Sequence, residues 1–428
     1  MAWFREKRAA LAMAVVVAIG AALRMYVATL GHNFDLDSYN IVADIVGRGE
    51  NVYSSTWRYN YGPVWLHVVF GLKALGTVIS SEPKEALGYL LSVLLTVTDI
   101  AIFFVLWKKA GKLAACLFFL NPISIIISGY HRQFDNIALL LGLAAVSVIG
   151  DRTDGRPNLR TFAGLAILGV SLMTKHILFA FPVWLAVKQK TWLRRVIFLA
   201  IPTLIFLLAF VPYWEYGQTG IIDNVFRYRS HQLEILFRLS VPEMLRPFID
   251  PRVYWLALLA LFGLVFRARD VLSSLMLYTC ILVAASPSTA NQYLPIVVPF
   301  IAINMNLFYA LYTVAGAWFL VGTVLGVSEL RDALPLDGNS WLTIAITLLS
   351  LGFAWQMLGR PTLAMLRRMR TRDARDTIAL APPDHPSPIS DVAGVFPDGH
   401  TAEVDAGNLI GGLDALAPVA PTGRDDQP

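Results

Sequence analysis

Two carboxylates one residue apart, Asp35 and Asp37, follow the first long apolar stretch and lie in the segment FDLDSY, residues 34–39. In an extended segment, side chains two residues apart point to the same side, so the spacing predicts one shared site. A carboxylate beside an apolar surface can act as a general base, bind a metal ion, or remain a solvated loop charge. As a pair they could also bind Mg²⁺ or Mn²⁺.

Polar side chains also occur at two later junctions, each between two successive apolar stretches. The segment GYHRQFDN contributes His131, Gln133 and Asp135, and a helix beginning after this turn would offer free N–H groups to an anion. Lys175 and His176 occupy a second junction. A lysine there can extend its ammonium to the membrane surface or bind a phosphate.

A third group of candidates is cationic. Arg227, Arg229 and His231 lie within five residues of one another in NVFRYRSHQ, and arginine binds phosphate through paired hydrogen bonds. Lipid headgroups or a phosphate-bearing substrate would both balance this charge. Further along, Gln292 lies in SPSTANQYLP, where it could bind a sugar hydroxyl or belong to helix caps.

An aromatic run, YSSTWRYNYGPVW at residues 53–65, contains Arg58 and Tyr61. Tyr and Trp settle at membrane interfaces because one end is apolar and the other forms hydrogen bonds. The alternative is a platform where sugar rings stack and prenyl chains enter, to which both residues would contribute.

The composition of the chain is typical of a membrane protein. The chain has 428 residues, of which 56% are hydrophobic and 15% charged, with a mean hydropathy of +0.58. Apolar runs recur along the chain, and about 20 such residues are needed to cross a bilayer. The net charge is +5, and the basic residues lie in short loops between apolar runs. Membrane topology accounts for basic residues in such loops, so the charge does not indicate nucleic-acid binding. Cys116 and Cys280 lie inside apolar runs, so no disulfide is indicated.

The positions of Lys and Arg predict which loops share a side, because short basic loops normally stay cytoplasmic. All basic clusters face one side if about twelve spans run near 11–30, 86–107, 113–128, 135–150, 161–174, 177–188, 196–213, 253–266, 271–286, 293–306, 308–326 and 341–358. Both chain ends are then cytoplasmic. The apolar stretch Val64–Ile79 does not cross and is expected to lie in the outer interface.

This topology gathers the candidate residues on the outer face. The outer segments would be 31–85, 129–134, 214–252, 286–292 and 327–340. Residues 1–372 form one transmembrane bundle, and residues 373–428, rich in Pro, Asp, Gly and Ala, are expected to be a disordered cytoplasmic tail. Asp99 lies inside a span, where an ionisable group must face the protein interior and is either structural or functional.

The order of these landmarks resembles the GT-C superfamily of membrane glycosyltransferases, which use polyprenyl-phosphate sugars. The fragments FDLDSY, RGENVY, RYNYGPVW, LLTVTDIAIFF, FLNPISIIISGYHRQFDNIALLL and LMTKHILFAFP are similar to successive landmarks of the GPI mannosyltransferase I catalytic subunit and of dolichyl-phosphate-glucose-dependent glucosyltransferases. The resemblance covers roughly residues 11–300. It implies an all-α, polytopic helical bundle with interfacial helices in a large first outer loop, and a catalytic aspartate at Asp35 or Asp37.

The resemblance also implies a reaction: transfer of a hexose, with mannose favoured, from a polyprenyl-phosphate donor to a hydroxyl of a glycan or glycolipid. The expected location is the outer face of a bacterial plasma membrane, among membrane lipids. The alternative is a transporter or a flippase for lipid-linked sugars, with Asp35, Asp37 and Asp99 as ion sites. Transporters tend to place such groups at the midplane within two similar halves, and no internal repeat is evident in this sequence.

Overall fold

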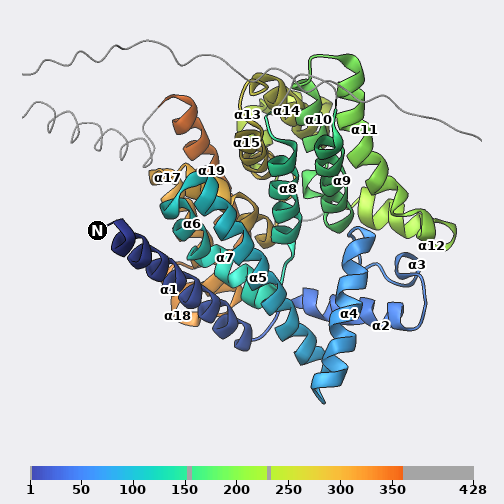
Figure 1. Cartoon of the computed structure of the whole chain (residues 1–428), viewed down its shortest axis with the longest axis vertical. Helices are drawn as coiled ribbons and strands as arrows, with labels where there is room; N and C mark the ends of the chain where they lie inside the picture. The colour runs from blue at the N-terminus through green and yellow to red at the C-terminus, as the bar shows by residue number, and fades with distance from the viewer. Residues whose placement is uncertain (1, 152–156, 229–232, 360–428) are drawn as a thin grey trace, which may run out of the picture. The chain divides into compact units, whose positions relative to one another are not determined.

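The computed structural model describes residues 2–151, 157–228 and 233–359. Within these ranges the secondary structure is entirely helical, as the apolar runs predict, and no strand occurs. Residues 152–156, 229–232 and 360–428, the last of which include the predicted tail at 373–428, lie outside the described residues. Figure 1 shows the course of the chain.

The helices differ widely in length. In chain order the α-helices are α1 (Ala2–Thr29), α2 (Phe34–Gly47), α3 (Val52–Ser55), α4 (Pro63–Ile79), α5 (Pro83–Ala110), α6 (Lys112–Phe119), α7 (Pro122–Ile126), α8 (Asp135–Ile149), α9 (Leu159–Thr174), α10 (Phe181–Val187), α11 (Trp192–Leu208), α12 (Trp214–Gly220), α13 (Ile235–Ser240), α14 (Pro251–Val265), α15 (Val271–Ala284), α16 (Val298–Ile303), α17 (Leu307–Phe319), α18 (Ser328–Ala333) and α19 (Gly338–Met357). Short 3₁₀ or π turns connect several of them: η1 (Ile127–His131), η2 (His176–Leu178), η3 (Val211–Tyr213), η4 (Ile221–Phe226), η5 (Glu243–Phe248), η6 (Asn291–Val297) and η7 (Leu320–Val324).

Five described segments are long and apolar enough to cross a membrane: Ala10–Thr29, Pro83–Ala110, Trp192–Phe226, Leu307–Val324 and Gly338–Met357. Two bent pairs raise the number to seven if each pair is one span: Lys112–Phe119 with Pro122–His131, bent by 47°, and Leu159–Thr174 with His176–Val187, bent by 120°. The protein is therefore a polytopic helical bundle. The predicted count of about twelve spans stays a prediction.

The prediction of a separate span over residues 177–188 does not match the helix found there. Helix α10 has only seven residues and rises about 10 Å, against a hydrocarbon core of roughly 30 Å. The chain instead turns sharply after α9 and continues through η2 into α10. Polar groups at the turn, Lys175 and His176, therefore lie at a break within a bent pair of helices.

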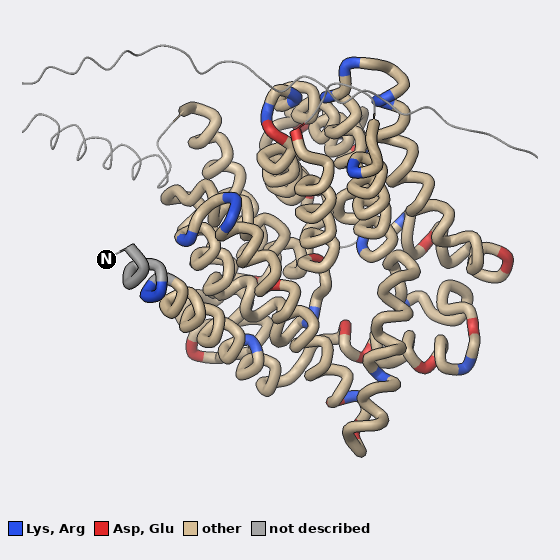
Figure 2. Tube along the Cα trace, in the orientation of Figure 1, with Lys and Arg blue, Asp and Glu red and all other residues tan. Residues whose placement is uncertain are grey.

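Three of the loops predicted to be cytoplasmic, near residues 151, 188 and 267–271, contact one another. Lys188 Nζ donates hydrogen bonds to the carbonyl oxygens of Arg267 and Arg269, at 3.0 and 2.5 Å. Asp151 Oδ1 accepts from the backbone N–H of Val271 at 2.7 Å. Figure 2 shows Lys and Arg positions where α10 meets α11 and where α14 ends. These three loops therefore lie together, and their cytoplasmic side stays a prediction.

Helices α2, α3, α4 and α12 form a group near the start of α5 (Figure 1), in which α2 packs on α4, α3 on α12, and α4 on α5. Helix α4 begins at Pro63 in its first turn, a favoured position because proline lacks the N–H that would be unpaired there. Gly62 precedes it, and a Cβ on Gly62 would collide with the carbonyl group of Met173 near the end of α9. This close approach brings the aromatic loop before α4 against the α9–α10 turn.

Candidate active site

Asp35 lies in the first turn of α2, where its carboxylate is half-buried. Its Oδ2 accepts hydrogen bonds from Asn33 Nδ2 and Gln133 Nε2, both at 2.5 Å. Burial raises the pKa of the Asp35 carboxyl above its ordinary value, although both hydrogen bonds and nearby Lys175 act in the opposite direction. A carboxylate with a raised pKa is suited to accept a proton near neutral pH.

Asp37 points elsewhere, so the prediction that the two carboxylates share one site is wrong. The prediction assumed an extended segment, whereas residues 34–47 form a helix, in which positions two apart are about 200° apart. Asp37 forms an ion pair with Lys84 at 2.6 Å, and the two side chains are 38% and 46% exposed. This hydrogen-bonded lysine lowers the pKa of Asp37.

The helical conformation of this segment has a local cause that is visible in the sequence. Asn33 is the N-cap, and its side-chain oxygen accepts from the backbone N–H of Asp35 at 3.1 Å. Asparagine is among the preferred N-caps, and acidic residues in the first turn favour helix formation through the helix dipole. Leu36, Tyr39 and Val42 are buried at helical spacing. The missed signal is therefore Asn33 itself.

The segment around His131 connects α2 to the bundle. A π-helical turn, η1, ends at His131, and Arg132 follows in the left-handed conformation with φ 55°. His131 Nδ1 lies 2.7 Å from Asn33 Nδ2, and Gln133 contacts Asp35 as described. The two residues on either side of Arg132 therefore contact the N-cap and the carboxylate of α2.

Lys175 lies at the centre of the site and is 5% exposed. Its Nζ donates to Asp135 Oδ2 at 2.6 Å and to Gln133 Oε1 at 3.0 Å. The ammonium also lies 5.0 Å from the ring centre of Tyr61 and 4.8 Å from that of Phe134, distances at which cations are attracted to aromatic rings. A single glutamine amide thus separates the Asp35 carboxylate from the Lys175 ammonium.

A cavity of about 540 Å³ opens beside Lys175. Its polar lining includes Tyr61, Lys175, His176, Arg252 and Gln292, and its apolar lining includes Phe206, Leu207, Phe226, Trp255 and Leu256. Leu207, Phe226 and Leu256 are each about half exposed. The cavity therefore reaches the outer surface of the bundle between α11, η4 and α14, and it combines a cationic part with an apolar part.

The remaining predicted residues lie in different places. Arg58 stacks on Phe34 at 4.0 Å and lies 5.7 Å from the ring centre of Trp57. Arg227 is exposed and forms an i,i+4 ion pair with Asp223 at 3.4 Å; it is not among the residues that line the cavity. Arg229 and His231 lie outside the described residues. Arg252, which was not among the residues predicted from the sequence, is the arginine that lines the cavity.

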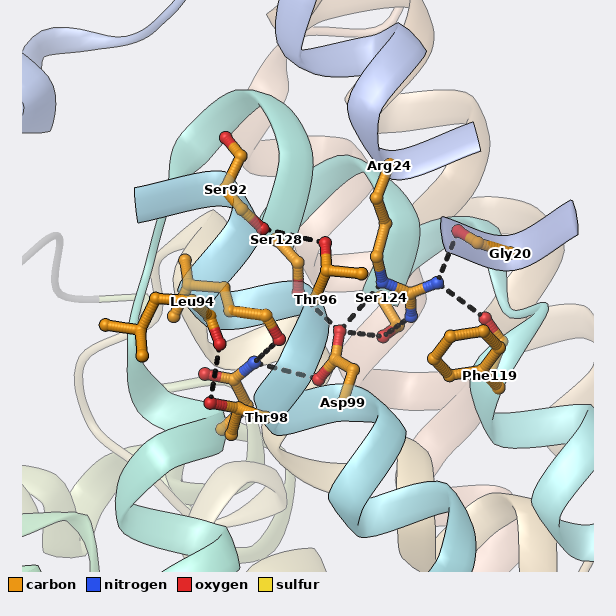
Figure 3. A network of polar contacts seen from close by, with 12 residues as sticks. Gly20, Arg24, Ser92, Leu94, Thr96, Thr98, Asp99, Phe119, Ser124 and Ser128 are labelled. Atoms are coloured by element: carbon orange, nitrogen blue, oxygen red, sulfur yellow. Dashed lines mark hydrogen bonds and ion pairs between the residues drawn. The ribbon is translucent and has the colours of Figure 1, made fainter. Parts of the chain in front are cut away.

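Asp99 takes part in a buried network separate from the cavity (Figure 3). Arg24 on α1 donates from Nε to Asp99 Oδ2 at 2.9 Å, and both side chains are essentially inaccessible to solvent. Ser128 also donates to this carboxylate at 2.7 Å. Of the two roles left open for Asp99, these contacts favour the structural one, with Arg24 as the counter-charge that the sequence analysis missed.

The metal-binding possibility lacks a suitable donor set in the part of the chain that the structure describes. Within residues 2–151, 157–228 and 233–359, no group of three or more His, Cys, Asp and Glu side chains is arranged to hold an ion. Since Asp35 and Asp37 point in different directions, they do not bind one ion together. No step below is assigned to a metal.

No protein-family model and no curated protein matches the sequence. Two crystal structures of ArnT from Cupriavidus metallidurans are similar in fold. The apo structure matches with a TM-score of 0.45 and 16% identity, covering 81% of this chain and 76% of that one. The structure bound to undecaprenyl phosphate matches with a TM-score of 0.43 and 15% identity, covering 80% and 75%. This likeness concerns the helical arrangement alone.

Proposed function

We propose that this protein is an integral membrane glycosyltransferase that moves a sugar from a polyprenyl-phosphate donor to a hydroxyl of a glycan or glycolipid. The proposed location is the outer face of a bacterial plasma membrane. The proposed donor sugar is a hexose, with mannose favoured from the sequence resemblance. Asp35 is the proposed general base, and the cavity beside Lys175 is the proposed donor site.

One observation carries this proposal: a half-buried carboxylate is linked through one amide to a buried ammonium that lines an amphipathic cavity. Gln133 donates to Asp35 and accepts from Lys175. A glycosyl transfer from a lipid phosphate needs a base on one side of the anomeric carbon and positive charge on the other. Asp35 and Lys175 supply the two groups at adjacent positions.

The lining of the cavity suits a lipid phosphate. Lys175, His176 and Arg252 supply cationic or hydrogen-bonding groups, and arginine in particular forms charge-assisted hydrogen bonds with phosphate oxygens. The apolar lining on α11 and α14 continues to the half-exposed surface of the bundle. A prenyl chain could enter there from the hydrocarbon region while its phosphate remains beside Lys175.

In the proposed reaction, the acceptor oxygen attacks the anomeric carbon and the bond from that carbon to the phosphate oxygen breaks. Asp35 takes the acceptor hydroxyl proton, and prenyl phosphate leaves with the bonding electron pair. A positioned general base contributes about 10² to 10⁴-fold to such a step. Cations that are fixed in place stabilise the charge that develops on the leaving group.

The transporter alternative draws no support from Asp99. That carboxylate is already bonded to Arg24, Ser128 and Asn136, so it is not an open ion site at the middle of the bundle. Asp37 is a half-exposed member of an ion pair. Of the three aspartates in the transporter hypothesis, Asp35 is the one linked through Gln133 to Lys175, which lines the cavity, and a catalytic role accounts for these partners.

The test uses purified full-length protein in nanodiscs with radiolabelled polyprenyl-phosphate mannose or glucose and a mixture of glycolipid acceptors from bacterial membranes. Transfer of label to an acceptor, absent for Asp35→Asn, is the expected result. Label that moves across proteoliposomes without forming a new glycoside would instead identify a flippase. Absence of both activities with each donor would contradict the proposed donor class.

A further inference from the structure

A second polar cluster lies directly behind the candidate active site. Asp135 and Asn136 are consecutive residues in the first turn of α8. Asp135 bonds Lys175, whereas the amide nitrogen of Asn136 donates to Asp99 Oδ1 at 2.8 Å. The start of this helix therefore contacts two separate ion pairs, Lys175–Asp135 and Arg24–Asp99.

Each of these two residues also has a buried oxygen that accepts no hydrogen bond from the described residues. The atoms are Asp135 Oδ1 and Asn136 Oδ1, and the whole Asp135 residue is only 2% exposed. A buried acceptor without a donor costs about 1–3 kcal/mol, so native proteins normally satisfy such atoms. Two neighbouring unsatisfied acceptors point to a bound donor.

A cavity of suitable size adjoins them. It measures about 10 Å³, which is about the volume that one water molecule needs. Its polar lining consists of Asp99, Ser124, Ser128, Gln133, Asp135 and Asn136. We propose that one water molecule occupies this cavity, donates one hydrogen bond to Asp135 Oδ1 and one to Asn136 Oδ1, and so connects the two ion pairs.

The charges of the lining favour water over a cation. The cavity is lined by two carboxylates, and each already has a cationic partner: Arg24 at 2.9 Å from Asp99 and Lys175 at 2.6 Å from Asp135. A sodium ion would add a positive charge to a site whose charges are balanced. Water is neutral and has two protons for the two acceptors.

The water would determine which way Asp135 faces. With Oδ1 bonded to water and Oδ2 bonded to Lys175, the carboxylate has a fixed orientation. Lys175 is then held beside Gln133 and the large cavity. Asn136 would act as a positioning residue for Lys175 through this water. Binding of the water does not depend on the proposed function, whereas the kinetic consequence rests on it.

The first experiment is a structure of the full-length wild-type protein in nanodiscs at a resolution that shows ordered water. The expected result is one density peak at about 2.7–3.0 Å, the usual hydrogen-bond length, from both Asp135 Oδ1 and Asn136 Oδ1. An empty cavity would overturn the proposal. So would a melting temperature that rises in sodium chloride but not in choline chloride at equal ionic strength, since that dependence would identify a cation.

The second experiment compares Asn136→Leu, a change of similar size that removes both the acceptor and the hydrogen bond to Asp99, with Ser171→Ala. Ser171 is buried and donates to Ala138 O at 2.7 Å, but it does not line the small cavity. Asn136→Leu should raise the donor KM by about two- to tenfold, the range expected for one net hydrogen bond, with kcat changed less. Ser171→Ala should lower the melting temperature and leave KM unchanged.

The outcomes separate the two claims. An unchanged KM in folded Asn136→Leu would overturn the positioning role, and water density that persists in that variant would overturn the bridging geometry. If the variant does not fold, the wild-type density still decides whether the water is present. If the protein transfers no sugar at all, the proposed function fails while the density and the salt-dependent melting still test the water site.

Discussion

Asp35→Asn and Asp37→Asn are the same chemical change two residues apart, and the structure predicts opposite results. Asp35 faces Gln133 at 2.5 Å beside the site, whereas Asp37 faces Lys84 at 2.6 Å near the surface. Loss of a general base lowers kcat by about 10² to 10⁴-fold, equivalent to about 2.7–5.5 kcal/mol of transition-state stabilisation. An exposed ion pair contributes about 0–1 kcal/mol, so Asp37→Asn should keep most of its activity.

The assay is sugar transfer in nanodiscs under saturating donor, with each variant adjusted to equal folded concentration by size-exclusion chromatography. Asp37→Asn serves as the matched control for Asp35→Asn. Two results would refute the reasoning: more than a tenth of wild-type kcat in Asp35→Asn, or equal losses in both variants. Equal losses would mean that the helical geometry of α2 does not separate the two carboxylates.

Folding of Asp35→Asn can be predicted separately from its activity. Burial raises the pKa of Asp35, so its folded-state pKa lies above the unfolded value. Such a group stabilises the folded state fully below the unfolded pKa and loses that contribution as pH rises through the folded pKa. Above the folded-state pKa the ionised carboxylate is thus a net cost, and there the Asn variant should melt no lower than wild type. Activity of the wild type should fall as pH drops through this raised pKa.

Three further variants test the surrounding structure. Lys175→Met leaves its buried carboxylate partner unpaired and should lower the unfolding free energy by about 3–5 kcal/mol in chemical denaturation; Lys175→Arg, which keeps the charge, should lose less. Arg24→Leu and Asp99→Leu should each lower the melting temperature strongly, because each leaves one charge buried without its partner. The double variant should melt above either single variant, because neither charge is then buried alone. A double variant that melts at or below the single variants would contradict this. Gly62→Ala should impair transfer by displacing the loop that meets α9, while Gly71→Ala, where a Cβ meets nothing within 4 Å, should not.

The sequence predicted the helical bundle and the grouping of basic loops because hydropathy and charge vary over stretches as long as whole helices. Basic loops near Lys188 and Arg267 were expected on one side, and they contact each other. His131 and Gln133 were expected among the substrate-binding residues; they contact Asn33 and Asp35, and their role in binding stays a prediction. These agreements arise because a bilayer sorts loops to its two sides, which limits the possible neighbours.

The details that failed depend on local backbone conformation and on contacts between distant helices. The side on which Asp37 lies depends on whether its segment is helical or extended, and the Asn33 cap decides it. Arg252 lines the cavity whereas Arg227 does not. This difference cannot be predicted from the local sequence. The counter-charge of Arg24 is not visible from the local sequence, since Asp99 lies 75 residues away.

Arg132 explains how the bundle places the proposed base before any substrate binds. Its backbone adopts φ 55°, a conformation that costs a non-glycine residue energy and persists only where surrounding contacts enforce it. The guanidinium supplies such contacts: it donates to the carbonyl oxygens of Gly88, Gly31 and Ala28 at 2.9, 3.1 and 3.0 Å. These bonds join the end of α1 to α5 and fix the reversal at which η1 ends.

The reversal has a direct consequence for the site. His131 precedes it and contacts Asn33, whereas Gln133 follows it and contacts Asp35. Both contacts lie at the start of α2, which belongs to the group of α2, α3, α4 and α12 and is not one of the long spans, so its position depends on such contacts with the bundle. A base held by two amides of fixed orientation does not have to be ordered during the reaction, and this is the condition under which general-base catalysis is efficient. The strain at Arg132 is therefore coupled to the orientation of Asp35.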